Sequence, residues 1–257
     1  CIRDRAQMLQ HQGVNYLAVA FADEGVLLRE RGIRMPIVVL NADEGSFDLM
    51  VAHRLEPEIY NFRSLAFFSK AVERVGEESY PIHIKLDTGM HRLGFMEGEL
   101  DMLTETLGET PSVKVATIFS HLNCSDMPQE DRYTREQIAR FDRMSGRLAA
   151  ALPYPVLRHT ANSAAIERFP EAQFDMCRLG LGLYGFGFEH NDELKPVSTL
   201  KSRIVQLKHL SAGEAVGYGR AGKLTRDSVT ATVPMGYADG LDRHLGCGRW
   251  SMLVAGR

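Results

Sequence analysis

Charged and polar side chains follow four apolar segments, at the points where buried strands of a parallel sheet would end. The segment HIKLD leads into DTGMHRLGF, which supplies Lys85 and Arg92. The segment ATIFSHLNCSD supplies His121, LRHTANSAA supplies Ser163, and MCRLGLGLYG supplies Arg178. Functional groups of parallel (β/α) barrels gather at the C-terminal ends of the strands. We therefore expect these side chains to share one site.

Ser163 and the glycine-rich segment after it are typical of an anion site. Ser163 stands at an expected strand-to-helix turn, and backbone N–H groups near Gly180 and Leu181 would suit a phosphate. A helix cap and turn glycines explain the same residues. Gly180, Gly182 and Gly185 also spell GxGxxG, but no helix pattern or acidic partner follows at the required distance. A dinucleotide site is therefore not predicted.

Three kinds of cationic or titratable side chain permit more than one interpretation. Lys85 is a candidate Schiff-base lysine, or it pairs with Asp87 or another carboxylate. His121 is an acid or base, a ring packed against a planar ligand, or a structural residue. Arg92 and Arg178 together indicate an anionic or aromatic heteroatom partner, although surface ion pairs explain either one.

The elements that would position these residues alternate between apolar runs and helical patterns from residue 14 to about 185. The clearest helical pattern covers residues 128 to 152, behind Asp126 as a candidate cap. The runs are VNYLAVA, PIVVLN, EPEIYN, YPIHIKLD, SVKVATIFSHL, PVLRHTAN and MCRLGLGLYG. Seven runs in this order predict an α/β fold, a (β/α)8 TIM-type barrel lacking its first strand, with a doubly wound sheet as the alternative.

The pattern changes after about residue 196. The segments LKSRIVQLKHL, SVTATVPMGYADG and SMLVAGR alternate apolar and polar residues between Gly-rich turns, with no amphipathic helix among them. We expect a barrel over residues 1–195 and the start of an incomplete C-terminal β domain over 196–257.

The composition favours small-molecule chemistry. The 257 residues are 44% hydrophobic and 25% charged, and the formal net charge of −3 gives no basic excess for nucleic acid or a membrane surface. The four cysteines are scattered and form no CxxC pair, so neither disulfides nor a metal site are predicted. No membrane span or signal peptide is recognised, and a cytoplasmic location is expected. A start at Cys1 and an end at Arg257, inside a strand-like segment, predict a fragment.

Taken together, six segments resemble alanine racemase across nearly the whole chain. They are YLAVAFADEG, HIKLDTGMHRLGF, HTANSAAIERFP, MCRLGLGLYG, GEAVGYG and VPMGYADG, in the family's order and with similar spacing. The resemblance implies a barrel and a β domain, with pyridoxal 5'-phosphate at the barrel mouth. It also implies a homodimer whose second subunit completes the active site, and no nucleic-acid or membrane partner.

The resemblance assigns roles to the barrel residues. Arg178 would face the pyridine nitrogen, and because an arginine keeps its own proton, the ring becomes a weaker electron sink. His121 would lie against the ring and orient Arg178. Arg92 would bind near the substrate carboxylate, positioned by Lys85, which then is a support residue like Asn162. The phosphate would be held by Ser163, Gly180 and Leu181.

In the C-terminal part, Tyr218 of GEAVGYG matches the catalytic tyrosine that exchanges the α-proton on one face of the substrate. A phenol with a pKa of about 10 needs cationic neighbours to act as a base at neutral pH. Arg243 is a candidate support for it. Tyr237 and Asp126 match positions that line the passage to the substrate from the two subunits.

One position of the family pattern has no counterpart here. The other acid/base is the Schiff-base lysine, in a KAxxYG-like segment just before the matching region, whereas the first lysine of this chain is Lys70. We therefore expect the parent protein to interconvert L- and D-alanine and so to supply D-alanine for peptidoglycan, with serine as a second candidate substrate. These 257 residues alone are expected to be inactive. The parent is either a racemase by itself or a longer protein in which the racemase follows a peptidoglycan-precursor ligase in the same chain. The alternatives are a pyridoxal-phosphate decarboxylase and a non-catalytic pyridoxal-phosphate-binding barrel.

Overall fold

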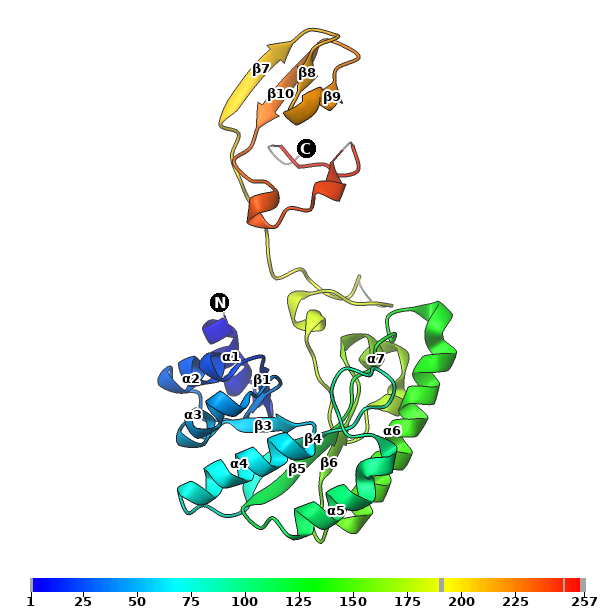
Figure 1. The fold of residues 1–257 in the computed structure, drawn as a ribbon. Coiled ribbons are helices and arrows are strands. Elements are labelled where there is room, and N and C mark those ends of the chain that lie inside the picture. Colours follow the sequence, from blue (N-terminus) through cyan, green and yellow to red (C-terminus); the bar gives the residue numbers. More distant parts are fainter. Residues whose placement is uncertain (1, 190–191, 247, 255–257) are drawn as a thin grey trace. The chain divides into compact units, whose positions relative to one another are not determined.

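The computed structural model describes residues 2–189, 192–246 and 248–254. The chain divides into two compact units, residues 1–197 and 198–257, and each is considered by itself. Figure 1 shows the first unit as a curled sheet flanked by helices and the second as a small assembly of short antiparallel strands. The division falls two residues after the expected boundary at 195.

Six parallel strands form the sheet of the first unit, in the order β1-β2-β3-β4-β5-β6. Successive strands are neighbours throughout, as in a (β/α) barrel, so the partial-barrel prediction is confirmed and the doubly wound alternative is wrong. The strands are β1 (Leu17–Val19), β2 (Ile37–Val39), β3 (Glu56–Ile59), β4 (Tyr80–Lys85), β5 (Val113–Phe119) and β6 (Leu157–His159).

The helices of the first unit connect these strands. Within the described residues none is both long and apolar enough to cross a bilayer. They are α1 (Ile2–His11), α2 (Ala22–Glu30), α3 (Phe47–Ala52), α4 (Phe62–Arg74), α5 (Leu100–Gly108), α6 (Asp131–Ala151) and α7 (Ser163–Arg168). Short 3-10 turns add η1 (Glu44–Ser46), η2 (Glu97–Glu99), η3 (Pro128–Glu130), η4 (Pro170–Ala172) and η5 (Leu181–Tyr184).

Helix α6 confirms the longest helical pattern but not its predicted cap. Ile138, Phe141 and Met144 form part of its buried stripe. The cap prediction for Asp126 is wrong, because η3 intervenes between it and α6, and α6 begins only at Asp131. Asp126 is exposed instead.

The predicted strand over residues 176–185 is also not formed. Its backbone makes one bond to the strand region, from Arg178 N to Ala161 O at 3.0 Å, and then turns into η5. Gly185 ends that turn with φ of 83°, a left-handed conformation that favours glycine. The physical reason is that the polar groups of this segment bind to side chains and strand ends, as described below, rather than to a neighbouring strand.

The second unit contains two antiparallel pairs. β7 (Gln206–Leu210) pairs with β10 (Ser228–Thr232), and β8 (Ala215–Val216) pairs with β9 (Gly222–Lys223). The 3-10 turn η6 (Tyr218–Arg220) lies between β8 and β9, and η7 (Tyr237–Asp239) and η8 (Arg243–Leu245) follow β10. This confirms a β domain. The strand expected in SMLVAGR is absent over residues 251–254, and 255–257 lie outside the described residues.

An aromatic cluster anchors α3 and α4 to the sheet. Phe68 is fully buried, and its ring meets Phe47 edge-on at 5.3 Å and Tyr80 at 5.4 Å between centroids. Edge-to-face pairs of this kind add to the free energy gained from burial alone. Phe67, its neighbour on the same helix, is 45% exposed.

We expect Phe68→Ala to lower the free energy of unfolding by about 3–5 kcal/mol, since it empties a tightly packed position. Phe67→Ala is the matched control, and we expect it to cost under about 1 kcal/mol. Urea unfolding followed by circular dichroism measures both. Equal costs for the two variants would show that this cluster does not anchor α4.

Candidate active site

The guanidinium of Arg178 is fixed by the ends of strands β5 and β6. Nη2 donates to Ser120 O at 2.7 Å and to Thr160 O at 3.2 Å, and Nη1 donates to His159 Nδ1 at 2.8 Å. Nη2 also lies 3.3 Å from His121 Nδ1. Among the described residues, Nε–H has no hydrogen-bond partner, so one donor of this held guanidinium remains for a ligand.

The surroundings of Arg178 control the charges at this site. Burial lowers the pKa of Arg178 to about 10, so it remains a cation at neutral pH. Burial, and then the charges of Arg178, Lys85 and Arg92, lower the pKa of His121 to about 4. His121 is therefore a neutral ring at pH 7 and accepts at Nδ1 from the arginine.

Lys85 pairs with a carboxylate that the sequence analysis did not single out. Its Nζ lies 2.6 Å from Glu58 Oε1, and both side chains are buried. Burial raises the pKa of Glu58, and the nearby cations Lys85, Arg178 and Arg92 oppose that rise. Of the two readings of Lys85, the ion pair is the one observed, with Glu58 in place of Asp87.

The loop that carries Arg92 folds back onto the end of β4. Asp87 N donates to Phe95 O and Phe95 N donates to Lys85 O, each at 2.9 Å. Gly94, with φ of 131°, lies so close that a Cβ atom would meet Asp87 N at 2.6 Å. This return brings Arg92 near enough to act electrostatically on His121 and Glu58.

Ser163 and the glycine-rich segment predicted to bind phosphate lie together. Ser163 is the first residue of α7, and its Oγ accepts from Gly180 N at 2.9 Å and Gly182 N at 3.3 Å. Asn162 caps the helix by accepting from Ala165 N at 3.0 Å. These bonds hold the glycine-rich segment against the start of α7, and binding of a phosphate there stays a prediction.

The remaining predicted residues lie elsewhere. Tyr218, Tyr237 and Arg243 belong to the second unit, and Tyr218 is 97% exposed. The contact observed for Arg243 is with Tyr237, whose ring centroid lies 5.7 Å from the guanidinium carbon. Support of Tyr218 by Arg243 stays a prediction.

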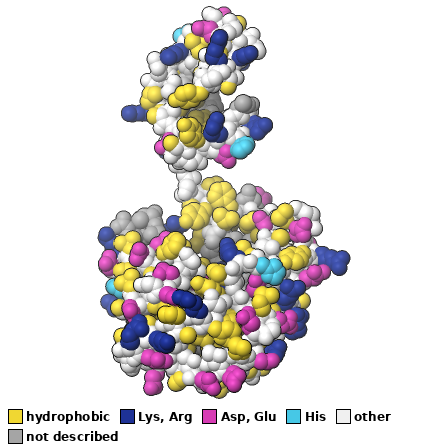
Figure 2. All heavy atoms as spheres, in the orientation of Figure 1, with side chains coloured by type: hydrophobic (Ala, Val, Ile, Leu, Met, Phe, Trp, Pro, Cys, Tyr) yellow, Lys and Arg dark blue, Asp and Glu magenta, His cyan; other side chains and the backbone are white. Residues whose placement is uncertain are grey.

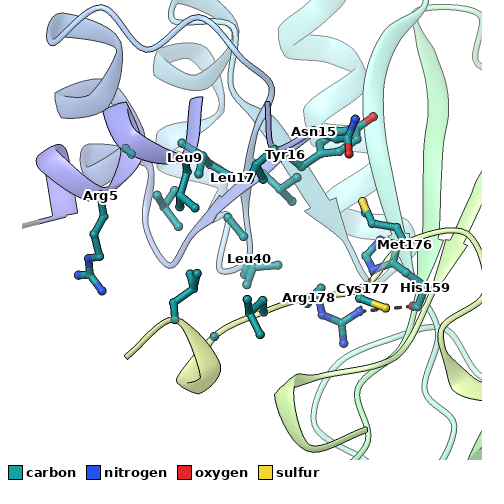
Figure 3. Close-up of a pocket in the computed structure, with 18 of the residues that line it drawn as sticks. Arg5, Leu9, Asn15, Tyr16, Leu17, Leu40, His159, Met176, Cys177 and Arg178 are labelled. Carbon is teal, nitrogen blue, oxygen red and sulfur yellow. Dashed lines mark hydrogen bonds between the residues drawn. The ribbon is translucent and has the colours of Figure 1, made fainter. Parts of the chain in front are cut away.

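A cavity of about 450 Å³ opens beside Arg178, and Figure 3 shows its lining. Arg178 and His159 form one wall, and apolar side chains such as Leu17 and Leu40 form another. Arg5 of α1 stacks over Tyr184, which joins the first helix to η5. Ligand sites typically combine apolar walls with a few fixed polar groups in this way.

On the visible face in Figure 2, basic and acidic side chains are mixed, without a continuous basic area. That distribution gives no support for nucleic acid as a partner of this face. The described residues contain no group of three or more potential metal ligands.

Fold and site together define a partial (β/α) barrel protein with a held arginine and a buried Lys85–Glu58 ion pair at its strand ends. Sequence profiles identify the family: "Alanine racemase, N-terminal domain" matches residues 2–187, and "Alanine racemase, C-terminal domain" matches 197–257. The chain belongs to the alanine racemase family, whose members are pyridoxal-phosphate-dependent isomerases.

Individual relatives agree. The chain is 36% identical over 258 residues to the alanine racemase of Sorangium cellulosum, covering 98% of this chain and 68% of that protein. It is similar to the crystal structure of alanine racemase from Streptomyces lavendulae, with a TM-score of 0.90, 29% identity, and coverage of 98% and 68%. An alanine racemase from Bartonella henselae with covalently bound pyridoxal phosphate matches with a TM-score of 0.78, 25% identity, and coverage of 95% and 67%. The chain spans about two thirds of the length of these relatives.

We expect His121 to titrate with a midpoint near pH 4 rather than near its ordinary 6.5. Because the unfolded chain takes up this proton first, the free energy of unfolding falls as the pH drops from 6.5 to 4. NMR titration of the ring measures the midpoint. His121→Gln identifies the resonance and should make this fall shallower, whereas a midpoint near 6.5 would contradict the buried, cation-flanked environment.

Proposed function

We propose that this chain supplies the cofactor-recognition and substrate-recognition parts of an enzyme that interconverts L-alanine and D-alanine, providing D-alanine for peptidoglycan. The observation that carries the proposal is Arg178, anchored through both Nη atoms with Nε–H left for a ligand. Family membership supports the same reading.

The residues present fit pyridoxal phosphate. Arg178 would face the pyridine nitrogen and, since a guanidinium keeps its protons at neutral pH, would donate a hydrogen bond without protonating the ring. Ser163, Gly180 and Leu181 would hold the phosphate, and His121 would pack near the ring as a neutral group. When bound, the cofactor supplies the electron sink that makes the α-proton of the amino acid acidic.

Proton transfer needs a group on each face of the substrate. Tyr218 is the proposed acid/base on one face, and its near-complete exposure on the second unit suits action in the site of a partner subunit. Arg92 would bind the substrate carboxylate, while Tyr237 and Asp126 would line the passage to it. Homodimer formation is part of this proposal.

The lysine that anchors the cofactor is not among these 257 residues in our proposal. Lys85 is buried against Glu58, so it is unsuited to that role. The role proposed for Arg178 also favours a racemase over a pyridoxal-phosphate decarboxylase, because a decarboxylase would present a carboxylate to the pyridine nitrogen. Serine is a second candidate substrate.

The test uses the complete product of the gene, and in parallel residues 1–257 alone, each with pyridoxal phosphate. We expect the complete protein to abolish the optical rotation of L-alanine without releasing carbon dioxide. Tyr218→Phe should lower kcat by about 100-fold or more in both directions. Tyr154→Phe is the control, because Tyr154 accepts from Val115 N at the opposite end of the sheet.

Carbon dioxide released in proportion to the loss of rotation would establish the decarboxylase instead, because decarboxylation of L-alanine gives achiral ethylamine. Neither reaction would favour the binding barrel. Residues 1–257 alone should give no racemisation and no borohydride-reducible adduct. A stoichiometric adduct on Lys85 would overturn the support role given to that residue.

A further inference from the structure

A continuous chain of buried hydrogen bonds crosses four successive strands and ends on Arg178. Glu56 Oε2 lies 2.8 Å from His83 Nε2, and His83 Nδ1 lies 2.8 Å from Thr117 Oγ1. Thr117 Oγ1 lies 3.0 Å from His159 Nε2, and His159 Nδ1 lies 2.8 Å from Arg178 Nη1. β3, β4, β5 and β6 each contribute one residue. We call this set the relay.

Both ends of the relay impose the same direction on its hydrogen bonds. Arg178 only donates, so His159 Nδ1 accepts. Burial lowers the pKa of His159 well below its ordinary value, so this neutral ring carries its one proton on Nε2 and donates to Thr117. At the other end the Glu56 carboxylate only accepts, so His83 donates from Nε2.

Thr117 completes the assignment. Its hydroxyl accepts from His159 Nε2–H and therefore donates its own proton to His83 Nδ1. If His83 carried a proton on Nδ1 instead, two N–H groups would meet the Thr117 oxygen and its hydroxyl proton would have no acceptor in a fully buried position. One direction, from Arg178 to Glu56, satisfies every group in the relay.

Packing holds the rings in the planes that this direction requires. Phe119 stacks on His159 with 5.0 Å between centroids and 2° between planes. Tyr16 meets His83 edge-on at 5.7 Å. Since packing holds both rings, the direction of the hydrogen bonds depends on which ring nitrogens carry the protons and not on rotation of the rings.

We propose that Glu56 is a remote positioning residue for Arg178. From the far end of the relay, its carboxylate holds the proton of His83 on Nε2, so that His83 Nδ1 accepts from Thr117 and the Thr117 oxygen stays free to accept from His159 Nε2. Without an acceptor at Glu56, His83 can carry its proton on Nδ1, which then competes with His159 Nε2–H for the Thr117 oxygen and weakens the hold on His159 and Arg178. The inference concerns Arg178 orientation, and its importance for catalysis rests on the proposed function.

The test is NMR of the ¹⁵N-labelled 257-residue chain without cofactor or substrate, so it is independent of whether racemisation is found. In the unaltered chain, we expect lone pairs on Nδ1 and protons on Nε2 of both His83 and His159. Glu56→Gln keeps an acceptor and should preserve both tautomers. Glu56→Leu removes it and should shift His83 toward the other tautomer and change the His159 ring signals, because His159 Nε2–H loses its acceptor at Thr117 to His83.

The second readout is exchange of the Arg178 side-chain protons with solvent, which we expect to be about tenfold faster in Glu56→Leu. Thr117→Val cuts the relay, and in that background Glu56→Leu should no longer affect His159. Thr160→Val is the matched control, because the buried Thr160 hydroxyl has no hydrogen-bond partner among the described residues.

A proton on His159 Nδ1 in the unaltered chain would overturn the proposal. Identical His159 signals in the Gln and Leu variants would also do so, as would equal effects of Thr117→Val and Thr160→Val. If Glu56→Leu fails to fold, the tautomers of the unaltered chain and the contrast between Thr117→Val and Thr160→Val decide the question.

Discussion

The site depends on how a buried cation is held. Nη2 of Arg178 donates to the carbonyl groups of Ser120 and Thr160, which become available where strands β5 and β6 end, and Nη1 donates to His159 Nδ1. A charged group taken out of water needs such partners, and a guanidinium has enough donors to use several acceptors and still keep one. The parallel sheet therefore does more than support the site: its strand ends supply the acceptors that orient Arg178.

The same sheet sets the charges around that arginine. Glu56 and Glu58 alternate with Pro57 along β3, while His83 and Lys85 flank Ile84 on β4, so each pair points to one face of the sheet. Glu58 neutralises part of the positive charge of Lys85 and Arg92, and Glu56 is linked to Arg178 through hydrogen bonds. Polar residues on one sheet face thus balance a cluster of cations while apolar residues on the other pack against helices.

The sequence allowed prediction of the strand order, the β domain and the convergence of His121, Ser163 and Arg178, because apolar runs and strand ends follow simple periodic rules. It did not reveal the roles of Glu56 and Glu58, since a carboxylate within EPEIY finds its partners on neighbouring strands. The available signal was a charged or polar residue at every second position in EPE and HIK, which places these side chains on one face of the sheet. The segment after Cys177 was mistaken for a strand because apolar composition does not show that its polar groups bind elsewhere. The roles of Tyr218, Tyr237 and Arg243 stay predictions.

The central claim is that Arg178 is held in advance with Nε–H available for the cofactor ring. The most direct measurement is NMR of the Arg178 Nε–H group in the ¹⁵N-labelled chain during titration with pyridoxal phosphate. We predict that this signal is visible before addition and that it shifts on binding, while the His159 ring signals keep their tautomer. A signal that does not respond to bound pyridoxal phosphate would contradict the claim.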